Sequence, residues 1–390
     1  MKIAFVFDGL QVGGIERVGV DYIRLLRKMG HEIDIINLAP ARKAMEKEID
    51  ESCKIFRINM PKKMTPGFYS RWTKRGAAFK AAYLIANIAL NVYGIFFKWL
   101  ISRRSIRSEY DVAIAFSGHY NDLTFVAHSF VKARKKLCWV HGAIYGYVLW
   151  SESYLRLYQK IHNLVVLSDL CQGDVLTTNQ WLNLNIHKIY NPSYIGEKKI
   201  DEIEIFKKKK RFGDYILMVG RFESDKDQET VVKALKYLNE KYGFDNNLVF
   251  VGDGSTRRKI EDFVKKEDLS NHVFFEGTKK AVESYFKSAY IFVHSSPLEG
   301  LPTTIIEALY FGLPVVASDS MPGVREVLEG GKYGWIVPVA DYIAMGEAIY
   351  TLYQNKDVYN RYKTDCTSKF IDFAPETIEE KCDSLLRELE

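Results

Sequence analysis

The stretch YIFVHSSPLEGLPTTIIEALYFGLPVVAS, residues 290–318, contains the pattern that decides the fold. An apolar run at 290–294 predicts a buried strand, residues 303–311 predict a helix, and a second apolar run at 314–318 predicts another strand. Two short buried strands joined by a crossover helix are typical of a parallel sheet. The stretch therefore predicts an α/β protein.

Strands and helices alternate in the same way through both halves of the chain. In the second half we expect strand 215–219, helix 228–241, strand 248–251, helix 255–267, strand 272–276, helix 280–288, and helical stretches at about 341–369 and 375–389. The first half begins with a strand at 2–7, a turn at 8–14 and a helix from Ile15. The sequence thus predicts two doubly wound Rossmann-like domains that face each other across a cleft, with ligands at the carboxyl ends of the strands.

The length of the chain also favours two domains. Single hydrophobic cores stop growing at roughly 250–300 residues, and this chain has 390. The strand pattern breaks near Asn191-Pro192, and the polar, Lys-rich stretch 197–211 is the expected linker. We therefore expect a first domain over 1–195 and a second over 196–374.

The cysteines and the N-terminus indicate the compartment. The five cysteines are an odd number and contain no Cys-x-x-Cys pair, which argues against a disulfide scaffold or a zinc site. The N-terminal apolar run is too short for a signal peptide and reads as a strand that enters a glycine turn. These features predict a cytoplasmic protein.

Two carboxylates and a helix start form the most specific candidate site. Glu299, followed by Gly300 and Leu301, lies in the loop after the strand 290–294, and Glu307 lies one turn into the next helix. The amides of Thr303 and Thr304 are at the start of that helix, where unpaired N–H groups and the helix dipole favour a phosphate. The alternative is that Glu299 is an ordinary exposed loop acid and that Glu307 pairs with a nearby base.

Basic residues and glycines follow other strands. Arg221 and Lys226 come directly after the strand 215–219 and can clamp a diphosphate, although loop cations are often only solvated. Gly13-Gly14 precedes the first long helix and would let the backbone approach a phosphate, and an ordinary tight turn is the alternative. Gly252-Asp253-Gly254 also turns out of a strand, and we interpret it mainly as a structural turn that lines the cleft.

These motifs together resemble family 4 of the retaining glycosyltransferases, which have the two-domain GT-B fold. The resemblance runs nearly end to end, and it is most specific in the second half. It rests on Gly13-Gly14, His141-Gly142, Gly220-Arg221 with Lys226, the segment 251–254, Phe275-Glu276-Gly277, the Glu299/Glu307 pair and the segment 314–317. Pro302 stands where Gly is more usual, which weakens the assignment of Thr303 and Thr304. His294 replaces a more usual Pro, and the sequence offers no interpretation of it.

The resemblance implies a role for each residue of the site. Arg221 and Lys226 would hold the donor diphosphate, Glu307 the ribose, Glu299 the transferred sugar, and Gly277 and Thr278 would line the nucleobase pocket. His141 would lie beside the reacting sugar, with a structural histidine at a strand end as its alternative, and Gly14 would close over the diphosphate. The final helix, 375–390, would pack back onto the first domain.

The resemblance also implies transfer with retention of anomeric configuration. The donor would be a nucleotide diphosphate sugar, UDP by prior expectation, that carries a hexose or N-acetylhexosamine. No cofactor is expected, and no metal, because fixed cations can neutralise the leaving diphosphate. Rival functions are a nucleotide-sugar epimerase of GT-B-like fold, a phosphorylase, and a non-catalytic membrane-associated regulatory partner.

A basic, acid-free segment points to the acceptor. Between Ser52 and Ser108 the chain has twelve Lys or Arg and no Asp or Glu. Apolar residues from Ala81 to Trp99 fall on one helical face, in a run shorter than the roughly 20 residues of a spanning helix. We expect 62–107 to dock on an anionic membrane, peripherally on the cytoplasmic leaflet, and the acceptor to be a lipid-linked glycan of bacterial surface polysaccharide synthesis. A buried domain helix over 76–101 is the alternative, and nucleic acid is not expected, because the aromatics do not alternate with the cations.

Overall fold

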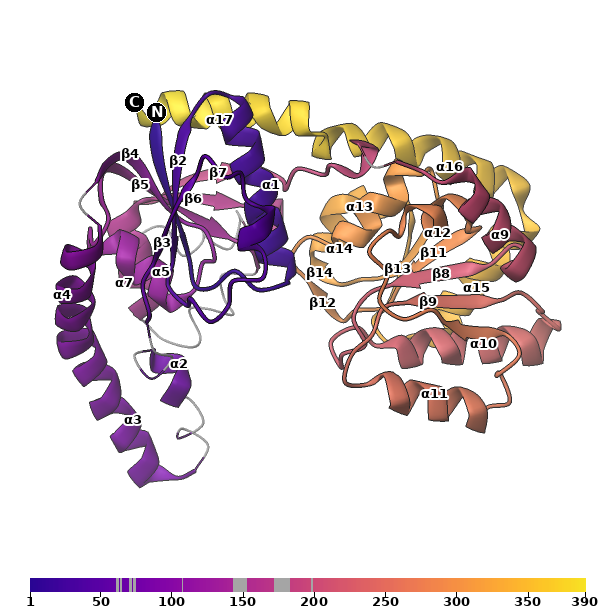
Figure 1. Ribbon diagram of the computed structural model, residues 1–390. Helices are drawn as coiled ribbons and strands as arrows, with labels where there is room; N and C mark the ends of the chain where they lie inside the picture. Colours follow the sequence, from indigo (N-terminus) through magenta and orange to yellow (C-terminus); the bar gives the residue numbers. More distant parts are fainter. Residues whose placement is uncertain are drawn as a thin grey trace. The chain divides into compact units, whose positions relative to one another are not determined.

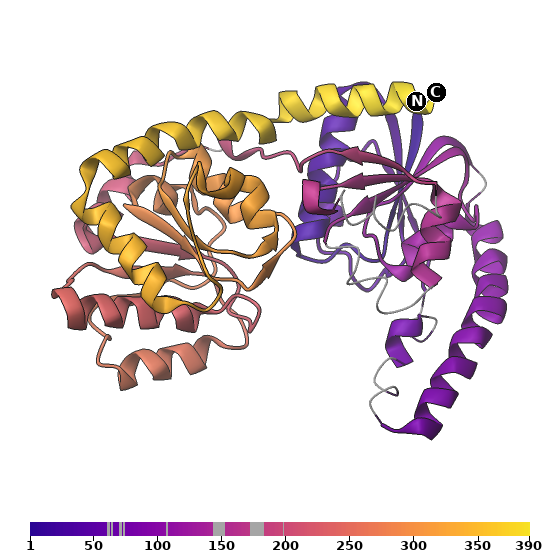
Figure 2. The ribbon, with the colours of Figure 1, turned by 180° about the vertical axis from the view of Figure 1, so that it is seen from behind.

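The computed structural model describes residues 1–60, 63, 65–69, 72, 75–106, 108–142, 153–171, 183–197 and 199–390 (Figures 1 and 2). It divides into two compact units. The first unit comprises Met1–Pro192 and Ile378–Glu390, and the second comprises Ser193–Thr377. Lys62, Arg71, Lys74 and Arg107 of the basic segment lie outside the described residues.

The first boundary lies at 192/193 and not at the expected 195/196, because contacts of Ser193 and Gly196 tie this segment to the second unit, and the second boundary lies at 377/378 in place of 374/375. The Ser193 N–H donates to the carbonyl of Phe373 (2.9 Å). Gly196 lies against the ring of Tyr310, which a Cβ at that position would approach to 3.2 Å. The boundary therefore falls before this segment.

The expected linker at 197–211 is wrong, because most of it is helix α9 (Glu202–Phe212) of the second unit. The carboxylate of Asp201 caps the helix by accepting from the amides of Ile203 and Glu204. Phe212 is buried, and Lys208 lies over the ring of Tyr285 at 4.4 Å. The aliphatic part of a lysine side chain can cover apolar surface. A Lys-rich sequence can therefore form a packed helix, although its composition is typical of a linker.

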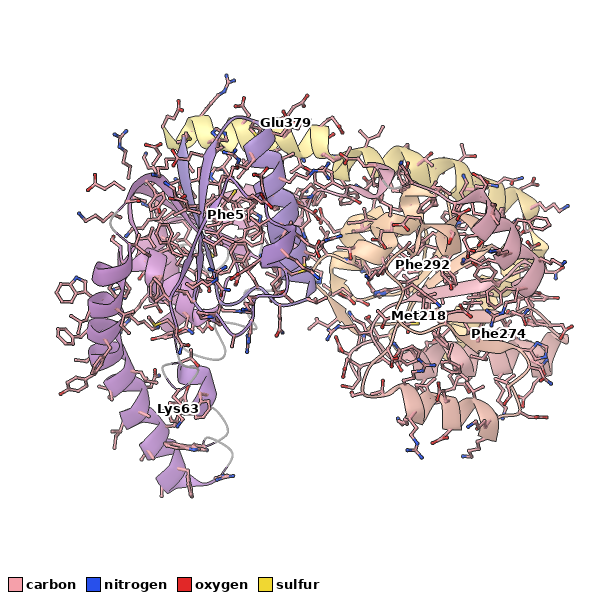
Figure 3. All side chains as sticks on the ribbon, in the orientation of Figure 1. Phe5, Lys63, Met218, Phe274, Phe292 and Glu379 are labelled. Atoms are coloured by element: carbon pink, nitrogen blue, oxygen red, sulfur yellow. The ribbon has the colours of Figure 1, made fainter. Side chains whose placement is uncertain are left out.

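The first unit is built on a seven-stranded parallel sheet with the order β3-β2-β1-β4-β5-β6-β7 (Figure 1). Its strands are β1 (Lys2–Phe7), β2 (Glu32–Asn37), β3 (Lys54–Arg57), β4 (Glu109–Ala115), β5 (Lys132–Val140), β6 (Asn163–Val166) and β7 (Asn185–Lys188). Its sheet-covering helices include α1 (Gly14–Lys28), α5 (Tyr120–Ala127) and α7 (Ser153–Ile161). Phe5, at the centre of β1, is fully buried (Figure 3). The strand order reverses between β1 and β4, which is the switch point where such sheets bind ligands.

The second unit is built on a six-stranded parallel sheet with the order β10-β9-β8-β11-β13-β15. Its strands are β8 (Ile216–Val219), β9 (Leu248–Val251), β10 (Val273–Phe275), β11 (Ile291–His294), β13 (Val315–Ser318) and β15 (Trp335–Val337). Met218 and Phe292 lie within this sheet and are buried (Figure 3). Here the order reverses between β8 and β11, so the loops after these two strands flank the switch point. The predicted fold class, α/β with two parallel sheets, is confirmed.

Helices complete the second unit around its sheet. They are α10 (Gln228–Tyr242), α11 (Arg257–Lys266), α12 (Glu283–Ser288), α13 (Thr303–Tyr310), α14 (Gly323–Val327), α15 (Tyr342–Gln354) and α16 (Lys356–Phe370). The expected single helical stretch at 341–369 is two helices, because the carboxamide of Asn355 accepts from the amides of Asp357 and Val358 and starts α16. A polar cap inside an amphipathic pattern marks such a break.

The last helix, α17 (Pro375–Leu389), packs on the first unit from Ile378 onward. Ile378, Cys382 and Leu389 are buried in this contact, and Glu379 pairs with Lys28 of α1 at 3.1 Å. The hydrophobic spacing along α17 thus buries one face on the unit that contains the N-terminus.

A long apolar helical segment extends from the first unit between β3 and β4. It consists of α3 (Ala77–Ala89), a π-helical turn (Leu90–Gly94) and α4 (Ile95–Ser105) (Figures 1 and 2). No side chain of α3 is buried, so the alternative of a buried domain helix is wrong there. Ala77–Ser102 is also long and apolar enough to cross a membrane by length and composition, which the sequence did not predict.

Candidate active site

Three glycine-containing turns lie side by side at the carboxyl ends of β8, β9 and β10. The Gly252 N–H donates to the carbonyl of Gly277 (2.9 Å), and the Phe222 N–H donates to the carbonyl of Asp253 (3.0 Å). Gly252 has φ +144°, and a Cβ there would lie 1.9 Å from the carbonyl oxygen of Gly220. The turns therefore pack backbone against backbone, which fixes the loop that carries Arg221.

Arg221 combines a fixed backbone with an extended side chain. Its carbonyl accepts from Nε2 of Gln228 (2.8 Å) at the start of α10. Its side chain is 71% exposed, and its guanidinium lies 3.9 Å from the carboxylate of Asp225. A planar cation with five donors, held at a sheet switch point, can grip a phosphate through two oxygens.

Lys226 lies on the same loop as Arg221. The residue that follows β11, on the other side of the switch point, contacts this loop. The hydroxyl of Ser295 lies 2.9 and 2.8 Å from the carbonyl oxygens of Lys226 and Asp227. Asp227 adopts the left-handed conformation (φ 47°) and caps α10 by accepting from Thr230. Lys226 Nζ lies 2.5 Å from Oε1 of Glu299. The structure thus brings the predicted residues Lys226 and Glu299 together.

Glu299 is held in its ionised form. Its Oε1 also lies 3.3 Å from Nε2 of His294, the last residue of β11. Burial raises the pKa of Glu299, but the hydrogen bonds and charges of His294 and then Lys226 outweigh it and lower the pKa to about 2. A carboxylate in this state accepts hydrogen bonds and donates none, as recognition of sugar hydroxyls requires.

A small parallel sheet fixes the turn that leads from Glu299 into α13. Glu299 in β12 (Leu298–Glu299) is in register with Pro322 of β14 (Met321–Pro322). A Cβ at Gly323 would lie 2.5 Å from the carbonyl oxygen of Gly300, so the two backbone segments are in direct contact here. Glu299 is therefore fixed from both ends.

Helix α13 begins at this turn with open amides. Its N-cap is Pro302, and no side chain caps its first amides, which belong to Thr303 and Thr304. Leu301 is buried, Thr303 is exposed, and Glu307 is half-buried one turn further on. Uncapped N–H groups at a helix start are suited to bind an anion.

The remaining residues predicted for the second unit lie along the same edge of its sheet. Gly277 and Thr278 follow β10, with Gly277 at φ +70° and Thr278 exposed. Their turn contacts the Gly252 turn, which in turn contacts the Arg221 loop. A ligand that binds Arg221 can therefore extend over these turns within the second unit.

His141, by contrast, belongs to the first unit, at the end of β5. Its Nε2–H donates to the carbonyl of Phe116 (2.6 Å), and its ring lies 5.0 Å from that of Phe116. Burial lowers the pKa of His141 to about 4, so the imidazole is neutral at pH 7. Because Nε2 holds the proton, Nδ1 carries the lone pair and can only accept.

Gly13 and Gly14 form the start of α1 in the first unit. Gly13 is the N-cap in an extended conformation (φ −166°). A Cβ at Gly14 would meet no atom within 4 Å. Packing therefore gives no reason for glycine at position 14, and the space beside this turn is open.

A polar cluster at the switch point of the first unit escaped the sequence analysis. The carboxylate of Asp8, after β1, lies 3.6 Å from Nδ1 of His119 and accepts from Nδ2 of Asn121 (3.0 Å). Buried Asp122 accepts from the amides of Gly118 and His119 (both 2.8 Å) and so fixes their turn. The sequence SGHYND directly after a strand was the signal that could have revealed it.

Residues 199–367, most of the second unit, match the family described as glycosyl transferases group 1. An uncharacterized glycosyltransferase of Haemophilus influenzae is 24% identical over 99% of both chains. A Campylobacter jejuni enzyme, described as GalNAc-alpha-(1->4)-GalNAc-alpha-(1->3)-diNAcBac-PP-undecaprenol alpha-1,4-N-acetyl-D-galactosaminyltransferase, is 26% identical over 45% of this chain and 48% of its own length.

Solved structures share the fold along the whole chain. Anabaena HepE, crystallised with UDP and glucose, has a TM-score of 0.72, with 19% identity and full coverage of both chains. Staphylococcus aureus TarM has a TM-score of 0.71, with 14% identity, and covers 98% of this chain and 99% of its own. The second unit thus matches the group 1 glycosyltransferases, a relative that aligns over the whole chain is also a glycosyltransferase, and the solved structures show that the chain has the GT-B fold.

Proposed function

We propose that this glycosyltransferase moves a hexose or N-acetylhexosamine, with retention, from a nucleotide diphosphate sugar to a glycan acceptor. The observation that carries the proposal is the group of Arg221, Lys226 and Glu299 at the switch point of the second unit, with two cations and one carboxylate. UDP is the proposed nucleotide, and the complex of HepE with UDP and glucose supports it.

In the proposed reaction the bond between the anomeric carbon and the diphosphate oxygen breaks as the acceptor oxygen attacks from the same face. The acceptor hydroxyl gives its proton to the leaving diphosphate. Negative charge grows on that group, so Arg221, Lys226 and the α13 amides stabilise the transition state. These cations do the work of a divalent ion, so we propose that no metal and no cofactor is needed.

The other predicted residues bind the rest of the donor. Glu307 accepts from the ribose hydroxyls, Gly277 and Thr278 line the nucleobase pocket, and Gly13 and Gly14 let the backbone approach the diphosphate. His141 contributes from the first unit and accepts a hydrogen bond at Nδ1 from a hydroxyl of the reacting sugar. The Asp8–His119 pair binds hydroxyls of the acceptor.

The acidic limb that His141 and Glu299 set in the pH–rate profile should lie below pH 5. His141 is neutral above its pKa of about 4, and Glu299 is ionised above its pKa of about 2. Both therefore keep their active states from pH 5 upward, so neither residue should give kcat/KM a titration step between pH 5.5 and 7. A loss of rate with a midpoint near pH 6.5 that disappears in His141→Gln would contradict this role.

The acceptor in the proposal is a lipid-linked glycan of bacterial polysaccharide synthesis. The Campylobacter jejuni relative is described as acting on an undecaprenol-linked saccharide, and an Erwinia amylovora relative as an amylovoran biosynthesis glycosyltransferase. Such acceptors lie at a membrane surface, which the first unit would have to reach.

Helices α3 and α4 provide the membrane contact in this proposal. Leu84, Ile88 and Val92 are 60%, 57% and 61% exposed. Further along the segment, Gly94, Lys98 and Ser102 are buried at helical spacing, and Lys98 lies 4.7 Å from the ring of Tyr120. Because α4 is anchored to the folded unit in this way, we favour a helix that lies in the plane of the cytoplasmic leaflet over one that spans it.

Polar replacement of the exposed apolar side chains of this helical segment should weaken membrane binding strongly. The triple variant Leu84→Gln, Ile88→Gln and Val92→Gln should reduce flotation with anionic vesicles more than about tenfold, since each buried aliphatic side chain contributes roughly 1.5–3 kcal/mol. The control is Ile203→Gln with Phe206→Gln, two equally exposed residues (66% and 69%) on α9. Flotation of the triple variant like the wild-type protein would contradict the docking proposal.

A panel of sugar nucleotides tests the function itself. Thermal stabilisation and slow hydrolysis should be seen with one class of sugar nucleotide, and transfer should follow when a lipid-linked saccharide is added. A protein that neither binds nor hydrolyses any sugar nucleotide would contradict the proposal. If the protein converted a nucleotide sugar to its epimer in the absence of an acceptor, the function would be epimerisation and not sugar transfer.

A further inference from the structure

We propose that His294 is a positioning residue that keeps Glu299 in place when Lys226 moves from this carboxylate to the donor diphosphate. The inference rests on the proposed function and names how its sugar-binding carboxylate is held. Its starting point is that one oxygen, Glu299 Oε1, has two nitrogen partners: Lys226 Nζ at 2.5 Å and His294 Nε2 at 3.3 Å.

The two partners differ in what can reach them. The side chain of Lys226 is 20% exposed, lies on the loop of the diphosphate clamp and also has Asp225 at 3.8 Å. The side chain of His294 is only 5% exposed, at the end of a central strand. An incoming diphosphate can therefore compete for Lys226, whereas it cannot reach His294.

Without a donor, the ammonium of Lys226 neutralises Glu299. A diphosphate carries more negative charge than one carboxylate and attracts Lys226 more strongly. Once Lys226 turns to the diphosphate, Glu299 would lose its nearest partner just when it must bind the sugar. The Nε2–H of His294 then remains as the donor to Oε1, and Oε2 faces the sugar hydroxyls.

The position of His294 itself is fixed by its surroundings. Its backbone pairs with Ala317 of β13, and Nε2 also lies 3.4 Å from the hydroxyl of Ser296. Among the described residues, its Nδ1 is buried and has no hydrogen-bond partner. The polar contacts of the ring are therefore made by Nε2, the atom that faces Glu299.

A double-mutant cycle tests this role. We expect His294→Leu to lower kcat for transfer by about 10- to 100-fold, since a fixed donor to the sugar-binding carboxylate is lost. His294→Gln places an amide N–H near the position of Nε2 and should restore the rate to within about fivefold of the wild-type protein. Because His294 acts through Glu299, the double variant His294→Leu with Glu299→Ala should be no slower than Glu299→Ala alone.

Binding of UDP separates this role from a folding defect. UDP lacks the sugar, so His294→Leu and His294→Gln should show the same UDP-induced rise in Tm as the wild-type protein. Additive losses in the double variant, a wild-type rate in His294→Leu, or a lost UDP response in His294→Leu would overturn the role. A wild-type protein that neither binds UDP nor turns over a UDP-sugar contradicts the proposed function, and with it this inference.

Discussion

Replacement of Arg221 by alanine is expected to slow sugar transfer by about 10²- to 10³-fold, because a charged contact to the leaving group contributes roughly 3–4 kcal/mol in the transition state. The backbone of Arg221 is fixed by Gln228, and its side chain is 71% exposed. The substitution should therefore leave the fold intact and remove only the cation. Steady-state kinetics with a fixed acceptor measure the effect.

A matched control is Arg361→Ala, which removes another exposed arginine from α16 of the same unit. Its rate and its Tm should stay close to those of the wild-type protein. Arg221→Lys should fall between the two, because a lysine keeps the charge but loses the two-pronged contact. A rate for Arg221→Ala within threefold of the wild-type protein would reject the assignment of the diphosphate site.

Gly252→Ala is expected to destabilise the second unit by about 3 kcal/mol or more, which is near the upper end for single substitutions. Two effects add at this position. Its φ of +144° disfavours any side chain, and a Cβ would lie 1.9 Å from the carbonyl oxygen of Gly220. A shift of the Gly220–Phe222 loop would also displace Arg221, so binding of UDP should weaken together with the fold. Thermal unfolding with and without UDP measures both effects.

Gly330→Ala is the matched control for backbone strain alone. Gly330 also has a positive φ (+64°), but a Cβ there would meet nothing within 4 Å. It should cost only about 1–2 kcal/mol, the usual penalty of the left-handed region, and should not alter binding of UDP. Equal losses in the two variants would show that the contact between the Gly252 and Gly220 turns contributes nothing.

Much of the second unit could be predicted because its local sequence patterns match the elements that its tertiary contacts stabilise. Buried parallel strands are continuous apolar runs, and loops after them share one edge of the sheet. For that reason the sequence alone predicts that Arg221, Lys226 and Glu299 lie at the same edge of the sheet. The segment Gly252-Asp253-Gly254 was also predicted to have an architectural role, but its close contact with Gly220 could not be predicted from the sequence.

Other features depend on tertiary contacts that no local pattern reveals. The pairing of His294 with Glu299 requires knowing which side of the loop each side chain faces. Helix α9 looked like a linker because its lysines cover apolar surface. The periodicity of residues 81–99 showed which side chains share a face, but whether another element covers that face is not encoded locally.

The central claim is that the second unit holds a nucleoside diphosphate at the carboxyl ends of β8 and β11. A crystal structure of the protein soaked with UDP tests this claim most directly. We predict diphosphate oxygens within hydrogen-bonding distance of Arg221 and Lys226, with the ribose at Glu307. A nucleotide bound with its diphosphate away from both cations would contradict the account.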